Sequence, residues 1–132
     1  MITRIKGHCR FFLIGLICFF IVLPASAKRK NPERWYQERY CQGELEVKLD
    51  DSTRIDCLTE EYAIEFDFAP KWAEAIGQSL YYAAKTKKKP AIVLIVERKQ
   101  HIKYVRNVAD LCRKLGIRLW FIENFRFYQK GY

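Results

Sequence analysis

Three acidic side chains on two neighbouring extended segments are the residues of this chain best suited to chemistry. Asp56 lies in the middle of one segment, and Glu65 and Asp67 lie two positions apart on the next. Side chains alternate along a strand, so Glu65 and Asp67 share a face, and neighbouring strands lie about 4.8 Å apart. If Asp56 points to the same side, three carboxylates converge. Mg²⁺ accepts such oxygens, binds a phosphodiester and lowers the pKa of a bound water, so the pattern indicates metal-dependent hydrolysis.

A simpler interpretation of the same acids involves no chemistry. Glu65 and Asp67 are then the solvated face of an antiparallel strand, which is the usual role of alternating acids. Asp56 then makes a surface ion pair with Arg54 or with a lysine, and such a pair contributes little to stability. Both interpretations are open at the level of the sequence.

The elements that must position these acids follow from hydrophobic periodicity and from turn residues. A helix begins at Pro32 and ends before Gly43, and the continuously apolar run 91–96 is typical of a central parallel strand. Further helices are expected at 70–85 and 103–115, and further strands at 44–49, 53–58, 62–68 and 117–122. The predicted order is α-β-β-β-α-β-α-β, an α/β (α+β) domain in which an antiparallel meander leads into a mixed sheet flanked by helices.

The order of elements and the acids together resemble the PD-(D/E)XK nuclease superfamily, which has a restriction-endonuclease-like fold. The resemblance covers roughly residues 32–121. It implies that Asp56 and Glu65 hold Mg²⁺, with Mn²⁺ as a substitute, and that Glu33 or Glu38 on the first helix is an additional ligand. The catalytic lysine of the family falls on Asp67, which would then be a third ligand or a base. Lys71 can reach back from the following helix to replace that lysine.

A second part of the resemblance concerns the substrate. Gln78 and Tyr82 match a Gln-x-x-x-Tyr helix motif that contacts substrate or supports the site in some members. The alternative is one exposed helix edge, with Tyr81 packed in the core. Lys87, Lys88 and Lys89 are candidate contacts to a nucleic acid.

The basic residues of the second half of the chain are expected to gather around one end of the domain. They are Lys85, Lys87, Lys88, Lys89, Arg98, Lys99, His101, Lys103 and Arg106. Such a patch can meet phosphates, or it can be a pair of solvated loops. Five aromatic residues near the C-terminus can stack bases or, as is commoner, complete the core with a docked tail. These are Trp120, Phe121, Phe125, Phe127 and Tyr128.

The first 27 of the 132 residues have the pattern of a cleaved secretory signal. A basic start precedes an apolar run at 11–23, which is shorter than the roughly 20 residues that span a bilayer, and Ala25-Ser26-Ala27 follows. We therefore expect a periplasmic or secreted domain at 28–132, without a membrane segment after cleavage. The net charge of +9 falls to +6 in that part, with 21 basic and 15 acidic residues. Its composition excludes a multi-span membrane protein and a largely disordered chain.

Three cysteines remain after the expected cleavage, in an oxidising compartment. Cys41 with Cys57 is the preferred disulfide, closing a loop of about 17 residues, and three buried thiols are the alternative. Cys112 fits a core position on a helix.

Two functions of different classes follow. The first is an exported Mg²⁺-dependent nuclease. The second is a non-catalytic exported domain on the same scaffold that binds a polyanion or a protein, which the replacement of the family's lysine by Asp67 favours.

Overall fold

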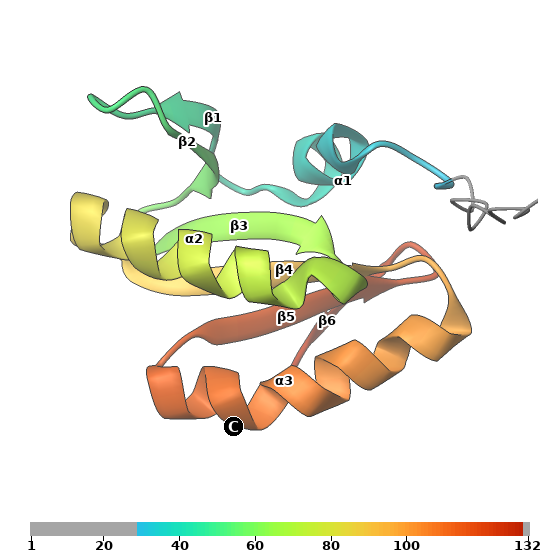
Figure 1. Ribbon diagram of the computed structural model, residues 1–132. Coiled ribbons are helices and arrows are strands. Elements are labelled where there is room, and N and C mark those ends of the chain that lie inside the picture. Colours follow the sequence, from blue (N-terminus) through green and yellow to red (C-terminus); the bar gives the residue numbers. More distant parts are fainter. Residues whose placement is uncertain (1–28, 131–132) are drawn as a thin grey trace, which may run out of the picture.

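The structure, a computed structural model, describes residues 29–130. The expected signal at 1–27 lies outside these residues (Figure 1). The helices are α1 (Glu33–Tyr40), α2 (Trp72–Thr86) and α3 (Ile102–Leu115), and short 3₁₀ turns, η1 (Ala69–Lys71) and η2 (Lys99–His101), precede α2 and α3. The strands are β1 (Glu44–Lys48), β2 (Arg54–Leu58), β3 (Tyr62–Phe68), β4 (Lys89–Val96), β5 (Arg118–Glu123) and β6 (Arg126–Gln129).

The six strands form one mixed sheet in the order β1-β2-β3-β4-β5-β6. The pairs β1–β2, β2–β3 and β5–β6 are antiparallel, and β3–β4 and β4–β5 are parallel. Parallel neighbours need a crossover connection, which α2 and α3 provide. The predicted α+β class, with a mixed sheet flanked by helices, is therefore confirmed.

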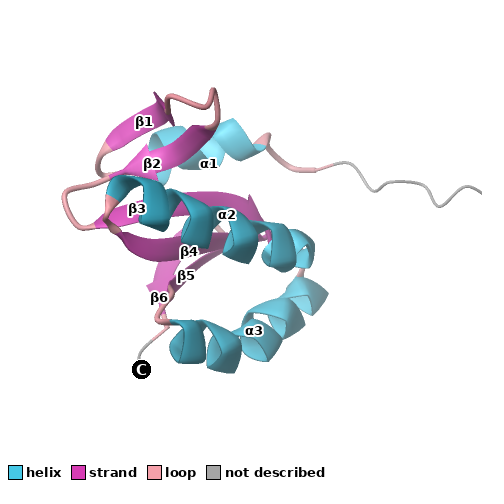
Figure 2. Ribbon diagram, turned by 60° about the vertical axis from the view of Figure 1, so that its left-hand side comes forward, coloured by secondary structure: helices cyan, strands magenta, loops and turns pink. Residues whose placement is uncertain are grey.

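The helices cover the two faces of the sheet unequally. Figure 2 shows α2 and α3 lying along the same side of the sheet. Buried residues of α2 and α3 pack there against one face of β4 and β5, which supply Ile92, Leu94 and Leu119. The short α1 covers part of the other face, where Tyr36 packs against Phe66, Phe68 and their neighbours. β4 is buried on both faces, as its continuous apolar run predicted.

One strand was missed by the sequence analysis. β6 pairs with β5 in a hairpin whose turn residues, Asn124 and Phe125, both have positive φ. This is the geometry of a two-residue turn that glycine usually occupies, so Asn-Phe gave no recognisable turn signal. The aromatic tail is docked: Phe127 contacts Trp120 and Tyr40, and Tyr128 stacks on Phe121.

A disulfide joins Cys41 to Cys57, as preferred from the sequence, and Cys112 is buried as a free thiol. The bond connects the end of α1 to β2. It adds a second covalent link between α1 and the sheet, beside the main chain that leads from α1 into β1. Within the described residues, no helix has the length and apolar character needed to cross a membrane.

The prediction that the basic residues gather at one end of the domain is wrong. Lys85, Lys87 and Lys88 precede β4 and Lys89 begins it, whereas Arg98 to Arg106 follow it, so the length of β4 separates the two groups. Eight residues of strand correspond to about 26 Å. The sequence placed both groups in loops beside β4 without deciding that these loops lie at opposite ends of the strand.

Candidate functional site

The site forms where β2 and β3 separate. The two strands pair only at Cys57–Ile64 and Leu58–Ala63, and before Cys57 the backbone of β2 leaves that of β3. Side-chain carboxylates replace the missing ladder bonds. The backbone N–H of Phe66 donates to Asp56 Oδ2 at 2.8 Å, and the backbone N–H of Asp56 donates to Glu65 Oε1 at 3.4 Å. Asp56 and Glu65 are therefore held inside the fork between the strands.

The acids of β3 are buried, so the interpretation of a solvated strand face is wrong. Glu65 is 3% exposed and Asp67 is 4% exposed. A surface ion pair between Asp56 and Arg54 is also wrong, because Arg54 pairs with Glu46 at 2.8 Å. Burying carboxylates together costs free energy unless protons, cations or hydrogen-bond donors compensate them. Placing these acids in the fork therefore costs the fold stability.

α1 adds a fourth acid to the fork. Of the two candidates on this helix, Glu33 interacts with both Asp67 and Asp56, whereas Glu38 forms an exposed ion pair with Arg34. Glu33 is at the first position of α1 and therefore lies at the end of the helix nearest to the carboxyl end of β3 (Figure 1). Glu33, Asp56, Glu65 and Asp67 are called the carboxyl cluster below.

The pKa values of the carboxyl cluster show that ionising these acids is unfavourable in this arrangement. Burial, followed by repulsion from Asp56, raises the pKa of Glu65 to about 9. Burial is also the main cause that raises the pKa of Glu33 to about 7, with repulsion from Asp67 and Asp56 added to it. Burial raises the pKa of Asp56 to about 6 and raises the pKa of Asp67 as well. Around neutral pH the cluster consequently retains protons, and perturbed carboxyls of this kind gather at functional sites.

Lys71 is the cation beside the cluster. Its Nζ lies 3.8 Å from Asp67 Oδ1 and 3.0 Å from Glu74 Oε2. Lys71 is in the 3₁₀ turn that leads from β3 into α2, four residues after Asp67. The chain reverses at this turn, which brings Lys71 back to the carboxyl end of β3. The hydrogen bond to Glu74 and the attraction of Asp67 raise the pKa of Lys71, which therefore remains charged.

A buried amide, which the sequence analysis missed, completes the site. Gln37 on α1 is 3% exposed; its Nε2 donates to Glu33 Oε1 at 3.4 Å, and its side chain also interacts with Asp56. The available signal was that Gln37 lies four residues after Glu33, so both share one side of the helix. Because Trp35, Tyr36 and Tyr40 suggested a purely apolar contact for α1, the polar side was overlooked.

The predicted helix motif is only half associated with the site. Tyr82 is buried against Ile55 and Ala63, and the charges of Glu65 and Asp56 act on its hydroxyl, whose pKa is raised mainly by burial. Gln78 is exposed on α2. The alternative of an exposed Tyr82 with Tyr81 in the core is wrong, because Tyr81 is 44% exposed and Tyr82 is 5% exposed.

The three candidate substrate lysines lie away from the cluster. Lys89 is paired with Tyr62 at the start of β3, five residues before Asp67, which corresponds to about 17 Å along the strand. Lys89 pairs with Glu61 at 2.8 Å, and Lys88 Nζ donates to the carbonyl oxygen of Glu60 at 2.6 Å. Lys87 is exposed at the end of α2. The structure thus brings Asp56, Glu65, Asp67 and Lys71 together but not Lys87, Lys88 and Lys89.

The carboxyl cluster suits a hard cation through two ligands rather than through three or four. Among residues 29–130, no group of three or more His, Cys, Asp or Glu side chains has the arrangement of a metal site. Asp56 and Glu65 do interact directly, and Mg²⁺ is usually held by one or two carboxylates together with waters and substrate phosphates. Their raised pKa values mean that a cation has to displace protons from them.

No family model, curated protein or solved structure matches this chain.

Proposed function

We propose that this protein is a Mg²⁺-dependent nuclease with a restriction-endonuclease-like fold, hydrolysing phosphodiester bonds at the carboxyl cluster. The observation that carries the proposal is the fork itself, where the buried carboxylate of Glu65 and the half-buried carboxylate of Asp56 replace backbone hydrogen bonds between β2 and β3. A structural role alone does not require four mutually repelling acids at one place. The meander β1-β2-β3, the α2 crossover to parallel β4, and α1 on the opposite face from α2 support the proposed fold.

The residues take the following roles. Asp56 and Glu65 would hold the metal, which would supply Lewis-acid stabilisation of the phosphate and make the attacking water more acidic. Glu33 and Asp67 adjoin this pair and accept the proton that leaves the attacking water. Lys71 takes the place of the family's strand lysine and stabilises negative charge that develops on the phosphate. Gln37 donates to Glu33 and holds it in the cluster.

Cleavage assays on the purified protein test the proposal. With plasmid and single-stranded DNA, we expect cleavage that requires Mg²⁺ or Mn²⁺ and falls by at least about 1000-fold in Asp56→Asn and in Glu65→Gln, because each removes a metal ligand. Glu61→Gln, at the other end of β3, is the matched control and should cleave normally. If the wild-type protein leaves both DNAs intact with either metal, the nuclease proposal fails, and a binding domain on the same scaffold remains.

We also propose that the domain works outside the cytoplasm, in the periplasm or secreted. The signal pattern at 1–27 and the Cys41–Cys57 disulfide support this location, since disulfides persist in oxidising compartments. Expression with and without residues 1–27, followed by fractionation of the cells, tests it. Export that does not depend on this segment would contradict the proposal.

A further inference from the structure

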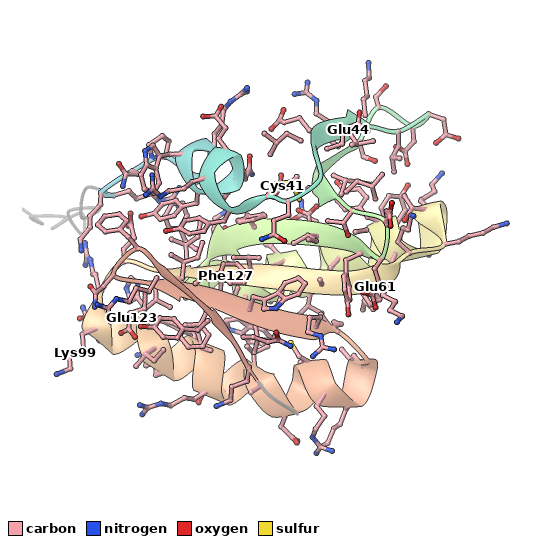
Figure 3. The ribbon with its side chains drawn as sticks, turned by 180° about the vertical axis from the view of Figure 1, so that it is seen from behind. Cys41, Glu44, Glu61, Lys99, Glu123 and Phe127 are labelled. Carbon is pink, nitrogen blue, oxygen red and sulfur yellow. A yellow bond between two sulfur atoms is a disulfide. The ribbon has the colours of Figure 1, made fainter. Side chains whose placement is uncertain are left out.

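The basic side chains at the two ends of β4 differ in whether they have acidic partners. The first group, here called the α2–β4 lysines, is Lys85, Lys87, Lys88 and Lys89. The second group, here called the α3 cations, is Arg98, Lys99, Lys103 and Arg106. Figure 3 shows the ends to which the groups belong, with Lys99 at one end of the molecule and Glu61, the partner of Lys89, at the other.

Three of the four α2–β4 lysines contact nearby groups, and two of these three form ion pairs with acids. Lys85 lies 3.4 Å from Asp50 and 3.6 Å from Asp51, and Lys89 lies 2.8 Å from Glu61. Lys88 donates to a backbone carbonyl oxygen. These contacts connect the β1–β2 hairpin and the β2–β3 turn to α2 and β4, so the lysines stabilise the fold at this end.

The α3 cations have no such partners. No ion pair within residues 29–130 joins any of the four to an acid. All four side chains are exposed, and no acidic residue occurs between Glu97 and Asp110. Lys99, Lys103 and Arg106 follow one another at intervals of four and three residues, which aligns them along one side of η2 and α3. The result is an uncompensated basic strip.

The basic strip lies at the same end of the sheet as the carboxyl cluster. β3 and β4 are parallel, and Asp67 is paired with Leu94. Arg98 follows Leu94 by four residues, so it lies at most about 14 Å farther along the chain. The start of α3 also packs on η1, the turn that carries Lys71, through Val105 and Ala69 in one core cluster. The strip and the cluster are thus parts of one rigid end of the domain.

We propose that the α3 cations bind the sugar–phosphate backbone of a nucleic acid whose scissile phosphodiester lies at the carboxyl cluster. This inference rests on the proposed function and assigns its substrate surface. A row of unpaired cations next to an acidic site supplies the attraction for a polyanion that the acids themselves repel. An anionic membrane surface fits less well, because helices that bind there insert large apolar side chains beside their cations. The large hydrophobic side chains that α3 exposes, Leu111 and Leu115, lie in its last turns, after Asp110, and none is exposed between residues 98 and 110 among the four cations.

Salt-dependent binding tests this surface separately from catalysis. Fluorescently labelled duplex and single-stranded DNA are titrated with purified protein in EDTA, over a series of KCl concentrations. We expect Lys99→Gln/Lys103→Gln to weaken binding about tenfold and to make the salt slope shallower by about 0.9 per lysine for duplex and about 0.7 for single strands. The matched control, Lys87→Gln/Lys88→Gln, removes the same charge at the other end and should leave both quantities unchanged.

Several results would overturn the inference. Absence of DNA binding by the wild-type protein, equal losses in both double variants, or a preference for vesicles that contain phosphatidylserine over DNA would overturn the inference. Thermal melting of each variant checks that the fold is retained, and Arg106→Gln is a further single test of the same strip. Cleavage that persists unchanged in Lys99→Gln/Lys103→Gln overturns the surface but not the nuclease. Salt-dependent binding through the strip without any cleavage overturns the nuclease but not the surface.

Discussion

Charged side chains are paired differently at the two ends of the β3–β4 pair. At the amino ends, Lys85 and Lys89 form ion pairs with acids, as in the Lys89–Glu61 pair, and Lys88 donates to a backbone carbonyl oxygen. At the carboxyl ends, four acids lie together in a partly buried fork, and the nearby cations of α3 are left without acids. This separation of the charges supports the proposal that a nucleic acid bridges the α3 cations and the carboxyl cluster.

The largest effect expected in this comparison concerns the Cys41–Cys57 bond, which joins the end of α1 to β2. Cys41→Ala/Cys57→Ala should lower the free energy of unfolding by about 3 kcal/mol, the chain-entropy estimate for a loop of this length. Because α1 carries Glu33 and Gln37, cleavage should fall as well. Urea denaturation and cleavage rates measure the two effects.

Reduction of the wild-type protein with a dithiol should reproduce the loss, and the same treatment of the double variant should change nothing. If the reduced protein is as stable as the oxidised protein, the disulfide does not hold α1 in place. The position of α1 beside the carboxyl cluster then depends on packing alone.

Next in size is the contrast between two ion-paired lysines. Lys71 lies 3.0 Å from Glu74 at the carboxyl end, and Lys89 lies 2.8 Å from Glu61 at the amino end. We expect Lys71→Met to lower the rate of cleavage by about 100-fold, because it removes the cation that stabilises the developing charge. Lys89→Met should leave the rate within about twofold. Similar cleavage rates in the two variants would show that Lys71 only forms a surface ion pair, as Lys89 does, and has no role in cleavage.

The last comparison concerns the pH dependence of stability. The pKa of Glu65 is raised to about 9 in the folded protein, above the ordinary value of 4.5, so the folded state binds more protons between these values. Its contribution to stability is complete below about pH 4.5 and is lost as the pH rises towards 9. Glu65→Gln cannot ionise, so at pH 8 it should be more stable than the wild type, and this advantage should shrink as the pH falls towards 5.

Thermal melts from pH 5 to about 9 measure this difference. Glu61→Gln is the control, because its carboxyl is exposed and has a lowered pKa, so the slope between pH 6 and about 9 should stay that of the wild type. A wild-type stability that rises over this interval would contradict the burial of ionisable acids at the fork.

Local pattern was enough for most of the secondary structure. The alternation in 62–68 predicted β3 with its observed bounds, and the apolar run at 91–96 predicted the central strand β4. Gly116 ends α3 in the left-handed conformation, as expected for a helix C-terminus. These features depend on neighbours a few residues away, which the sequence contains directly. β6 was missed because its turn depends on positive φ at two residues, Asn124 and Phe125, of which phenylalanine rarely adopts it.

The site was predicted in part, for a physical reason. Alternation along a strand determines by itself that Glu65 and Asp67 share a face. It does not determine whether that face is wet, and the solvated alternative was equally consistent with the sequence. Their burial depends on α1, α2 and the twist of β2, which are separated from them in the chain. The same applies to Glu33, which only the path of α1 across the fork distinguished from Glu38.

The sequence by itself determined the elements other than β6, the shared face of the two β3 acids, and the charge of the two basic groups. Only the tertiary structure decided where β2 parts from β3, so that Asp56 and Glu65 fill the fork. It also decided that β4 separates the basic groups and that the α3 cations, rather than Lys87 to Lys89, share an end with the acids. Periodicity is a local property of the chain, whereas strand pairing and the direction of a crossover join residues that are distant along it.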